Sequence, residues 1–162
     1  MICTVAEFTT LWQREMGFTA KALRALTDAS LAQRVTAEDR SLGELAWHLA
    51  TTIPEMMGRT GLALEAGDAE APAPASAVAI AAAYERASQG LLAAVTSSWR
   101  DETLTVEDEM YGERWPRSFT LTALILHEIH HRGQMTVLMR QAGLVVPSLY
   151  GPNREETAAM MG

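Results

Sequence analysis

The amino-acid sequence predicts an all-α fold, a four-helix bundle with a possible short hairpin inserted before the last helix. Apolar residues recur at spacings of three and four along four separate segments, which is the pattern of amphipathic helices. Two of these segments begin with a capping box, and most of the prolines fall outside the periodic stretches. Four such helices of one chain bury their apolar faces most simply against each other, as a bundle.

The first two helices are predicted from their capping boxes and the apolar stripes that follow. Thr4-Val5-Ala6-Glu7 places a hydroxyl at the helix start and a carboxylate three residues later, and the stripe continues over about residues 5–27. Ser41-Leu42-Gly43-Glu44 repeats the signal, and the second helix is expected to end at about Gly58 or Gly61.

The third helix is predicted from Ser76 through Trp99, in an alanine-rich segment. Residues 66–75 have no periodicity, and their alternating proline and alanine favour an extended connection.

The segment between the third and last helices predicts a short hairpin. Residues 103–106, TLTV, have the composition of a strand, and residues 110–116 are expected to hold a turn and a return strand. The acidic run 107–109 between them is expected to form a solvated loop. The last helix is predicted from Ser118 or Thr120 to Arg140 or Ala142, with Gly143 ending it and a polar tail following.

Length, charge and cysteine content narrow the classes of protein that the chain can belong to. Its 162 residues favour a single domain over 1–162. The net charge is −7 and Lys21 is the one lysine, which disfavours binding to nucleic acid or to an anionic membrane. Cys3 is the one cysteine, so no internal disulfide can form, and a cytoplasmic location is expected. No secretion signal or apolar run long enough to span a bilayer is evident.

Histidines supply the strongest functional signal. His127 and His131 are four residues apart on the last predicted helix, so they lie on one face and can share an ion. His48 projects from a partly apolar stripe of the second helix, and facing helices of a bundle lie about 8–10 Å apart. Imidazole nitrogens bind Zn, Ni and Fe, so the three residues are candidate ligands of one divalent ion with open coordination positions.

Residues 127–131 also read H-E-x-x-H, the motif of zinc metalloproteases. Helical geometry allows Glu128 to reach a metal-bound water, but the wider context disfavours a protease. The longer metzincin motif requires a glycine and a histidine where this chain has Gln134 and Val137. No edge strand is evident to hold a peptide, and Glu128 receives no catalytic assignment.

Several neighbours of the histidines are candidates for supporting roles. Gln134 lies on the ligand face, where it can orient a histidine or contact bound water. His130 points about 80–100° away from the pair and is expected at an interface or behind the ligands. Arg132 also points away, as a surface or interhelical ion-pair partner. Tyr111, Trp115 and Tyr150 are candidates for a pocket mouth, with core packing as the alternative.

Three segments of the chain resemble the DinB/YfiT-like family of bacterial metal-binding four-helix bundles. They are SLGELAWHLA at 41–50, WPRSFTLTALILHEIHHRGQM at 115–135 and LMRQAGLVVPSLYG at 138–151. The H-x-x-x-H-R-G-Q motif of the last helix is the specific part. The resemblance implies His48, His127 and His131 as metal ligands, the same set that their spacing indicates.

The resemblance also implies a class of function. Characterised relatives include S-transferases and isomerases that use the thiols mycothiol or bacillithiol, and homodimers are common. We therefore expect a metal-dependent, thiol-dependent S-transferase that acts on a small molecule, with a low-molecular-weight thiol as cosubstrate and a homodimer as the assembly. Two alternatives stay open: a metal-dependent hydrolase, and a non-catalytic metal-stabilised protein acting in stress response or binding.

Overall fold

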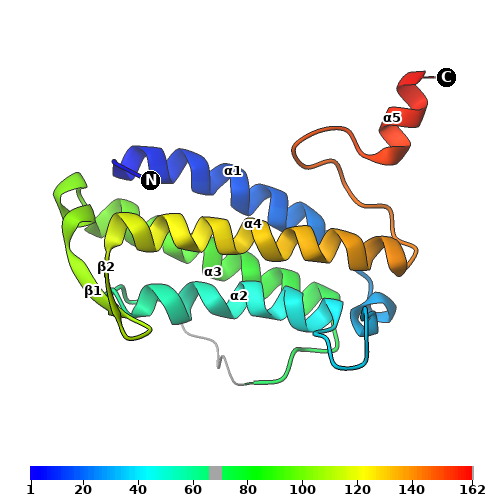
Figure 1. Ribbon diagram of the computed structural model, residues 1–162, viewed down its shortest axis with the longest axis horizontal. Helices are drawn as coiled ribbons and strands as arrows, with labels where there is room; N and C mark the ends of the chain where they lie inside the picture. The colour runs from blue at the N-terminus through cyan, green and yellow to red at the C-terminus, as the bar shows by residue number, and fades with distance from the viewer. Residues whose placement is uncertain (66–70, 162) are drawn as a thin grey trace.

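Four long helices form the body of the protein, as a computed structural model that describes residues 1–65 and 71–161 shows (Figure 1). They are α1 (Val5–Arg24), α2 (Leu42–Gly58), α3 (Ala77–Ser98) and α4 (Arg117–Gln141). Each contributes large side chains to a shared apolar core, among them Trp12, Leu49, Tyr84 and Leu121, all at most 2% exposed. The predicted all-α bundle is confirmed.

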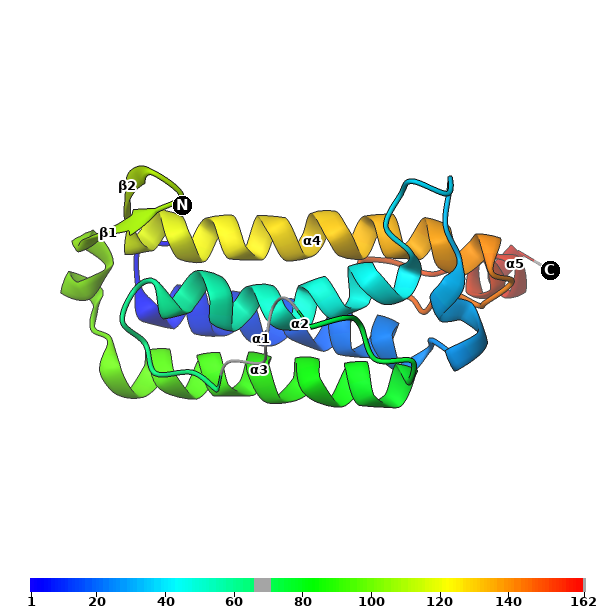
Figure 2. The same ribbon diagram turned by 90° about the horizontal axis from the view of Figure 1, so that it is seen from below.

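The helices pack so that α2 lies against α3 and α4, and α1 lies against the same two helices. Figure 2 shows α1 and α4 running in one direction and α2 and α3 in the other. Because α2 and α3 are parallel, α3 begins at the same end of the bundle as α2 (Figure 2). Residues 66–70 of the predicted extended connection lie outside the described residues. This arrangement makes α2 and α4 direct neighbours.

Both predicted capping boxes are present. The Thr4 hydroxyl accepts the Glu7 N–H at 3.0 Å, and the Glu7 carboxylate accepts the Thr4 N–H at 3.1 Å. Ser41 and Glu44 make the same exchange at 3.2 and 2.6 Å. The predicted end of the first helix is wrong by a turn: α1 ends at Arg24, and Thr27 caps a 3₁₀ helix, η1 (Asp28–Ala32). The Thr27 hydroxyl accepts a hydrogen bond from the Ser30 N–H, which favours the start of a new helix over the continuation of α1.

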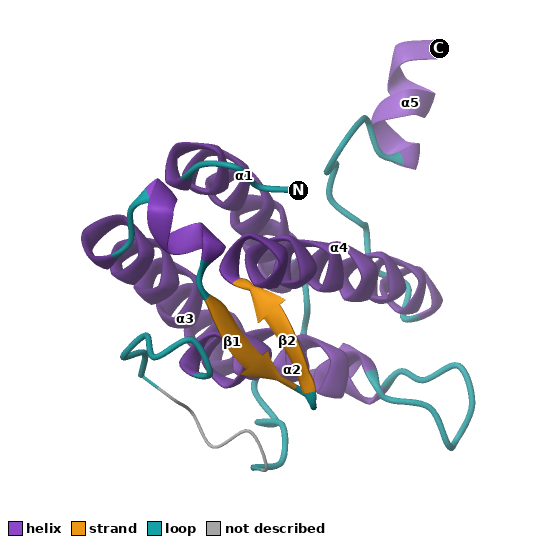
Figure 3. Cartoon of the chain, turned by 60° about the vertical axis from the view of Figure 1, so that its left-hand side comes forward, coloured by secondary structure: helices purple, strands orange, loops and turns teal. Residues whose placement is uncertain are grey.

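The hairpin is present, but its first strand is not the predicted one. Strand β1 (Glu107–Met110) pairs antiparallel with β2 (Glu113–Pro116), across the end of the bundle where α4 begins (Figure 3). Residues 103–105 belong instead to a 3₁₀ helix, η2 (Asp101–Thr105), which buries Leu104. The acidic run was predicted to be a solvated loop, but it forms the first three residues of β1. Its side chains alternate, as in a strand: Asp108 lies 2.7 Å from Arg117, while Glu107 and Glu109 are exposed.

The hairpin turn consists of Tyr111 and Gly112, which have φ angles of +56° and +87°. Positive φ at both central residues is the geometry of a type I′ turn, which matches the twist of the two strands. Glycine adopts this conformation without cost, whereas an aromatic residue does so rarely. Tyr111 is therefore held in place by its contacts.

The predicted polar tail contains a fifth helix, α5 (Arg154–Met161). It stands away from the bundle at the end of an extended segment (Figure 1), and none of its residues is buried. Its link to the bundle is an ion pair in which Arg140 donates to both carboxylate oxygens of Glu155, at 2.7 and 2.9 Å. Within the described part of the chain, no helix is long and apolar enough to cross a membrane.

Candidate metal centre

The three predicted histidines lie together between α2 and α4. His48 comes from α2, and His127 and His131 come from successive turns of α4. One ring nitrogen of each lies within 4.8 Å of the corresponding nitrogens of the other two. Among residues 1–65 and 71–161, this is the one group of three or more metal-ligating side chains gathered so closely. We refer to these residues as the histidine cluster.

The spacing of the cluster suits a metal ion. Nitrogens bound at about 2.0–2.2 Å to one ion, at tetrahedral or octahedral angles, lie about 2.8–3.6 Å apart. The Nε2 atoms of His48 and His127 are separated by 3.1 Å. The His131 ring centroid lies 4.4 Å from that of His127 and 4.9 Å from that of His48. Three imidazoles with these separations can hold an ion and leave coordination positions free.

The protonation state of the cluster also suits metal binding. Burial lowers the pKa of His48 to about 4, helped by the charge of Arg40 and by His131. Burial likewise lowers the pKa of His127 to about 4, with His131 and His48 adding to the effect. The pKa of His131 is lowered as well, again chiefly by burial. At neutral pH the rings are uncharged, which is the form in which imidazole binds metals.

Two side chains on the same helices contact the rings from behind. His131 Nδ1 lies 2.7 Å from Gln134 Oε1, so the ring donates its N–H to the amide oxygen and Nε2 keeps its lone pair. The predicted orienting role of Gln134 agrees with this contact. Thr52, one turn beyond His48, places its hydroxyl 3.3 Å from His48 Nδ1. The buried Nδ1 of His127 has no partner among the described residues.

A pocket of about 590 Å³ opens beside the cluster, and we call it the hairpin pocket. His48 and His127 form one end of it, and Tyr111 and Trp115 of the hairpin form part of its wall. The remaining lining residues are Thr51, Thr52, Glu55, Met56 and Ala123. Of the three aromatic residues predicted at a pocket mouth, Tyr111 and Trp115 therefore line a pocket. The third, Tyr150, is not, because its hydroxyl is bonded to Glu15 and Arg132.

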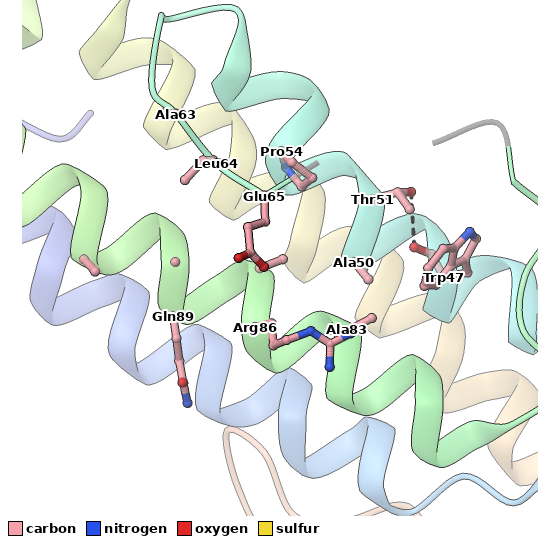
Figure 4. Close-up of a pocket in the computed structure, with 13 residues that line it drawn as sticks. Trp47, Ala50, Thr51, Pro54, Ala63, Leu64, Glu65, Ala83, Arg86 and Gln89 are labelled. Atoms are coloured by element: carbon pink, nitrogen blue, oxygen red, sulfur yellow. Dashed lines mark hydrogen bonds between the residues drawn. The ribbon is translucent and has the colours of Figure 1, made fainter. Parts of the chain in front are cut away.

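A second pocket, of about 670 Å³, lies on another face of α2, between α2, α3 and residues 63–65 (Figure 4). Its charged lining residues are Glu65 and Arg86, and its wall includes Trp47, whose carbonyl accepts a hydrogen bond from Thr51 at 3.2 Å. It contains no histidine. The hairpin pocket is smaller, but it is the candidate site because, of the two pockets, only this one is lined by residues of the histidine cluster.

Glu128, the central residue of the H-E-x-x-H match, does not reach the cluster. It is 1% exposed and points away from α2, toward α1 and α3, where it accepts hydrogen bonds from the hydroxyls of Thr19, at 2.7 Å, and Tyr84. Burial raises its pKa, against the opposing effect of these two donors. The match to the protease motif is therefore confined to the two histidines.

Arg132 was predicted to be a surface or an interhelical ion-pair partner; the structure shows the interhelical pair, with the side chain 1% exposed. Its guanidinium lies 2.5 Å from a carboxylate oxygen of Glu15 on α1 and donates to the Thr19 hydroxyl at 2.8 Å. The partners that α1 and α3 supply to Glu128 and Arg132 were not predicted; they are Glu15, Thr19 and Tyr84. One signal was available: Glu15 is a carboxylate on the apolar side of an amphipathic helix, where a charge requires a partner.

Two further residues of α4, His130 and the glycine of the H-R-G-Q motif, lie at the surface. His130 is exposed, and its ring is 5.0 Å from that of His131 without joining the cluster. Gly133 has no atom within 4 Å of the position that a Cβ would occupy, so no backbone packs against it.

The fold and the site together define a four-helix bundle with a three-histidine cluster between neighbouring helices, a common place for metal sites in bundles. The chain belongs to the DinB family, whose model matches residues 1–161.

Similar proteins extend this assignment. The chain is 42% identical over 158 residues to YrdA of Bacillus subtilis (strain 168), an uncharacterized protein, covering 98% of this chain and 95% of YrdA. The crystal structure of a DinB-like protein from Bacillus cereus ATCC 10987 is similar with a TM-score of 0.88 and 43% identity, over 93% of this chain and 100% of that one. The DinB-like protein YjoA of Bacillus subtilis shares the fold, with a TM-score of 0.68 and 14% identity over 85% and 92%.

Proposed function

We propose that this protein binds a divalent metal ion, Zn, Ni or Fe, through His48, His127 and His131. We further propose that it is an enzyme that transfers a low-molecular-weight thiol to a small molecule. The observation that supports an enzyme over a metal-stabilised scaffold is the hairpin pocket, since two histidines of the cluster line it directly. An ion held by three protein ligands beside an open pocket keeps a position for an exchangeable ligand.

The residues of the site have separable tasks in this proposal. A bound divalent ion supplies a positive charge that lowers the pKa of a thiol or of water. His48, His127 and His131 hold the ion in their neutral form, and Gln134 fixes the tautomer of His131 through the 2.7 Å contact. The walls of the hairpin pocket hold the second substrate and limit its access to water.

The first test is the metal content of protein purified without an affinity tag. We expect about one divalent ion per chain in the wild type and far less in His127→Ala. The matched control is His130→Ala, which removes an exposed histidine of the same helix and should keep the metal. Equal metal content in the wild type and in His127→Ala, or content far below one per chain in the wild type, would overturn the metal site.

The second test separates the transferase from the two alternatives. Metal-loaded protein is supplied with an electrophilic aryl chloride and a thiol, so that the sulfur forms a bond to carbon and chloride leaves. A rate that requires thiol, metal and His127 supports the transferase. Turnover of an ester with no thiol supports a hydrolase. Loss of thermal stability on chelation with neither activity supports a metal-stabilised binding protein.

We propose a cytoplasmic homodimer, on the basis of the common assembly of the family and the single exposed thiol of Cys3. Sedimentation of the purified protein tests the dimer directly, and a monomer at micromolar concentration would overturn it.

A further inference from the structure

The hairpin pocket differs at its two ends, and the difference bears on what it binds. One end holds the ring nitrogens of His48 and His127. The other end consists of the aromatic and apolar side chains of Tyr111, Trp115 and Met56, together with the Glu55 carboxylate that Tyr111 contacts. Pockets of about 300–1,000 Å³ accommodate small molecules, and 590 Å³ lies inside that range.

The polar atoms of the two aromatic side chains are already bonded. The Trp115 indole N–H donates to the Glu113 carboxylate at 2.7 Å, and the Tyr111 hydroxyl donates to the Glu55 carboxylate at 2.7 Å. What these side chains can offer a ligand is therefore apolar ring surface. The rings are also held against neighbours: Trp115 lies 4.8 Å from Phe119 and 5.9 Å from Tyr111, both edge to face.

Tyr111 is held in a conformation that its backbone disfavours. Its φ of +56° is uncommon for a bulky residue, and such positions persist only where surrounding contacts determine them. Here the contacts are the Glu55 hydrogen bond and the Arg59 guanidinium, 4.6 Å from the centre of the ring. A turn of this type forms more readily with asparagine or glycine at this position. Contacts with Glu55 and Arg59 thus hold Tyr111 at the pocket wall in a backbone conformation that its side chain disfavours.

Charge around the pocket distinguishes the ligands that it can accept. Glu55 is the one carboxylate among the lining residues, and the lining holds no lysine or arginine. Arg59 lies behind Glu55 and donates two hydrogen bonds to one of its oxygens, at 3.0 and 2.8 Å. An anionic group placed near the hairpin would meet a carboxylate and no cation on the lining, so its desolvation would be uncompensated.

We propose that the hairpin pocket binds compounds carrying an uncharged aromatic group, which lies against Trp115, Tyr111 and Met56 while a donor atom of the compound points to the histidine cluster. The preference for an aromatic group is inferred from the residues that line the pocket. The orientation of the donor atom rests on the proposed metal site, and the two are tested separately.

The first experiment uses the metal-free protein and three probes: phenylmethanethiol, ethanethiol and 4-(sulfanylmethyl)benzoate. Dissociation constants are measured by ligand-observed NMR. We expect phenylmethanethiol to bind at least about tenfold more tightly than ethanethiol, because it buries a ring among aromatic side chains. The benzoate should lose most of that gain, because its carboxylate approaches Glu55. Equal binding of the phenyl and ethyl compounds, or tightest binding of the benzoate, would overturn the aromatic preference.

Variants at Trp115 locate the binding. Trp115→Ala should remove most of the difference between the dissociation constants of phenylmethanethiol and ethanethiol. Trp115→Phe should keep most of that difference. The matched control is Trp47→Ala, an identical substitution in the wall of the larger pocket, which should leave the difference unchanged. Circular dichroism checks that each variant folds. A loss in Trp47→Ala equal to that in Trp115→Ala would place the probe elsewhere and overturn the assignment.

The second experiment repeats the titration on Co²⁺-loaded protein and follows the visible absorption of the cobalt. A spectral change on adding phenylmethanethiol, absent with toluene, places the sulfur at the cluster. If the wild type takes up no Co²⁺, the proposed metal site fails while the NMR result still decides the aromatic preference. If Co²⁺ binds and phenylmethanethiol leaves its spectrum unchanged, the proposed orientation is wrong.

Discussion

Arg132 and Glu15 form an ion pair whose side chains are 1% and 0% exposed. Replacing Arg132 by methionine leaves a buried carboxylate without its main partner, and losses of about 3–5 kcal/mol are typical of such changes. We expect Arg132→Met to lose about that much of the free energy of unfolding, measured in urea. Arg140→Met is the control, because its pair with Glu155 is partly exposed and such pairs contribute at most about 1 kcal/mol. Equal losses would contradict the prediction.

Substitution of Gln134 should lower the metal affinity of the protein and change its free energy of unfolding little. Gln134 is exposed, and its amide oxygen accepts a hydrogen bond from His131 Nδ1 at 2.7 Å. We expect Gln134→Leu to weaken Co²⁺ binding about 10–100-fold, the usual effect of losing a partner behind a ligand. Competition with a chelating dye measures the affinity. Gln141→Leu, at the end of α4, should change it little; a similar loss there would make the effect nonspecific.

Residues that act together across long sequence separations were the hardest to predict. The ligand pair on α4 follows from helical spacing, and His48 follows from its place on the apolar stripe of the second helix. The partners of Glu128 and Arg132 do not follow in this way. Thr19 and Glu15 are 109 and 117 residues distant, and which side of α1 faces α4 depends on the packing of the whole bundle.

At the scale of secondary structure, the four long helices were predictable because each has a continuous apolar stripe and two have capping boxes. The hairpin was harder to place. Its strands are only four residues long and have a single buried residue, Met110, so they carry no apolar alternation, and the rest of β1 is acidic. Helix α5 also lacks a buried face, so no pattern marks it.

The hairpin turn gives a prediction for this element. Gly112 has a φ of +87°, which an alanine adopts only with strain. We expect Gly112→Ala to destabilise the hairpin by about 1 kcal/mol, and to increase hydrogen exchange at its amides more than in α1. Because Tyr111 is adjacent, the variant should also weaken binding of phenylmethanethiol. Unchanged exchange in β1 and β2 would show that the turn tolerates the side chain.

For the whole molecule, a metal held between α2 and α4 should stabilise the folded state, since the cluster joins residues that are 79 positions apart in sequence. A ligand present at 100 times its dissociation constant adds about 2.7 kcal/mol if it binds only the folded form. We expect the melting temperature to rise with added Co²⁺ and to fall again with chelator. His127→Ala should show no such dependence, and a similar rise in this variant would indicate that the ion binds elsewhere.

Helix α4 presents two pairs of polar residues to different neighbouring helices: His127 and His131 face α2, and the next residue of each, Glu128 and Arg132, faces α1. Successive residues of a helix are separated by about 100°. A single-residue deletion before His127 would therefore turn Glu128 and Arg132 toward α2, and a single-residue insertion there would turn the two imidazoles into the core. This segment can vary by substitution at its exposed positions, but its length is constrained, because one helix contributes both to the histidine cluster and to a buried ionic contact.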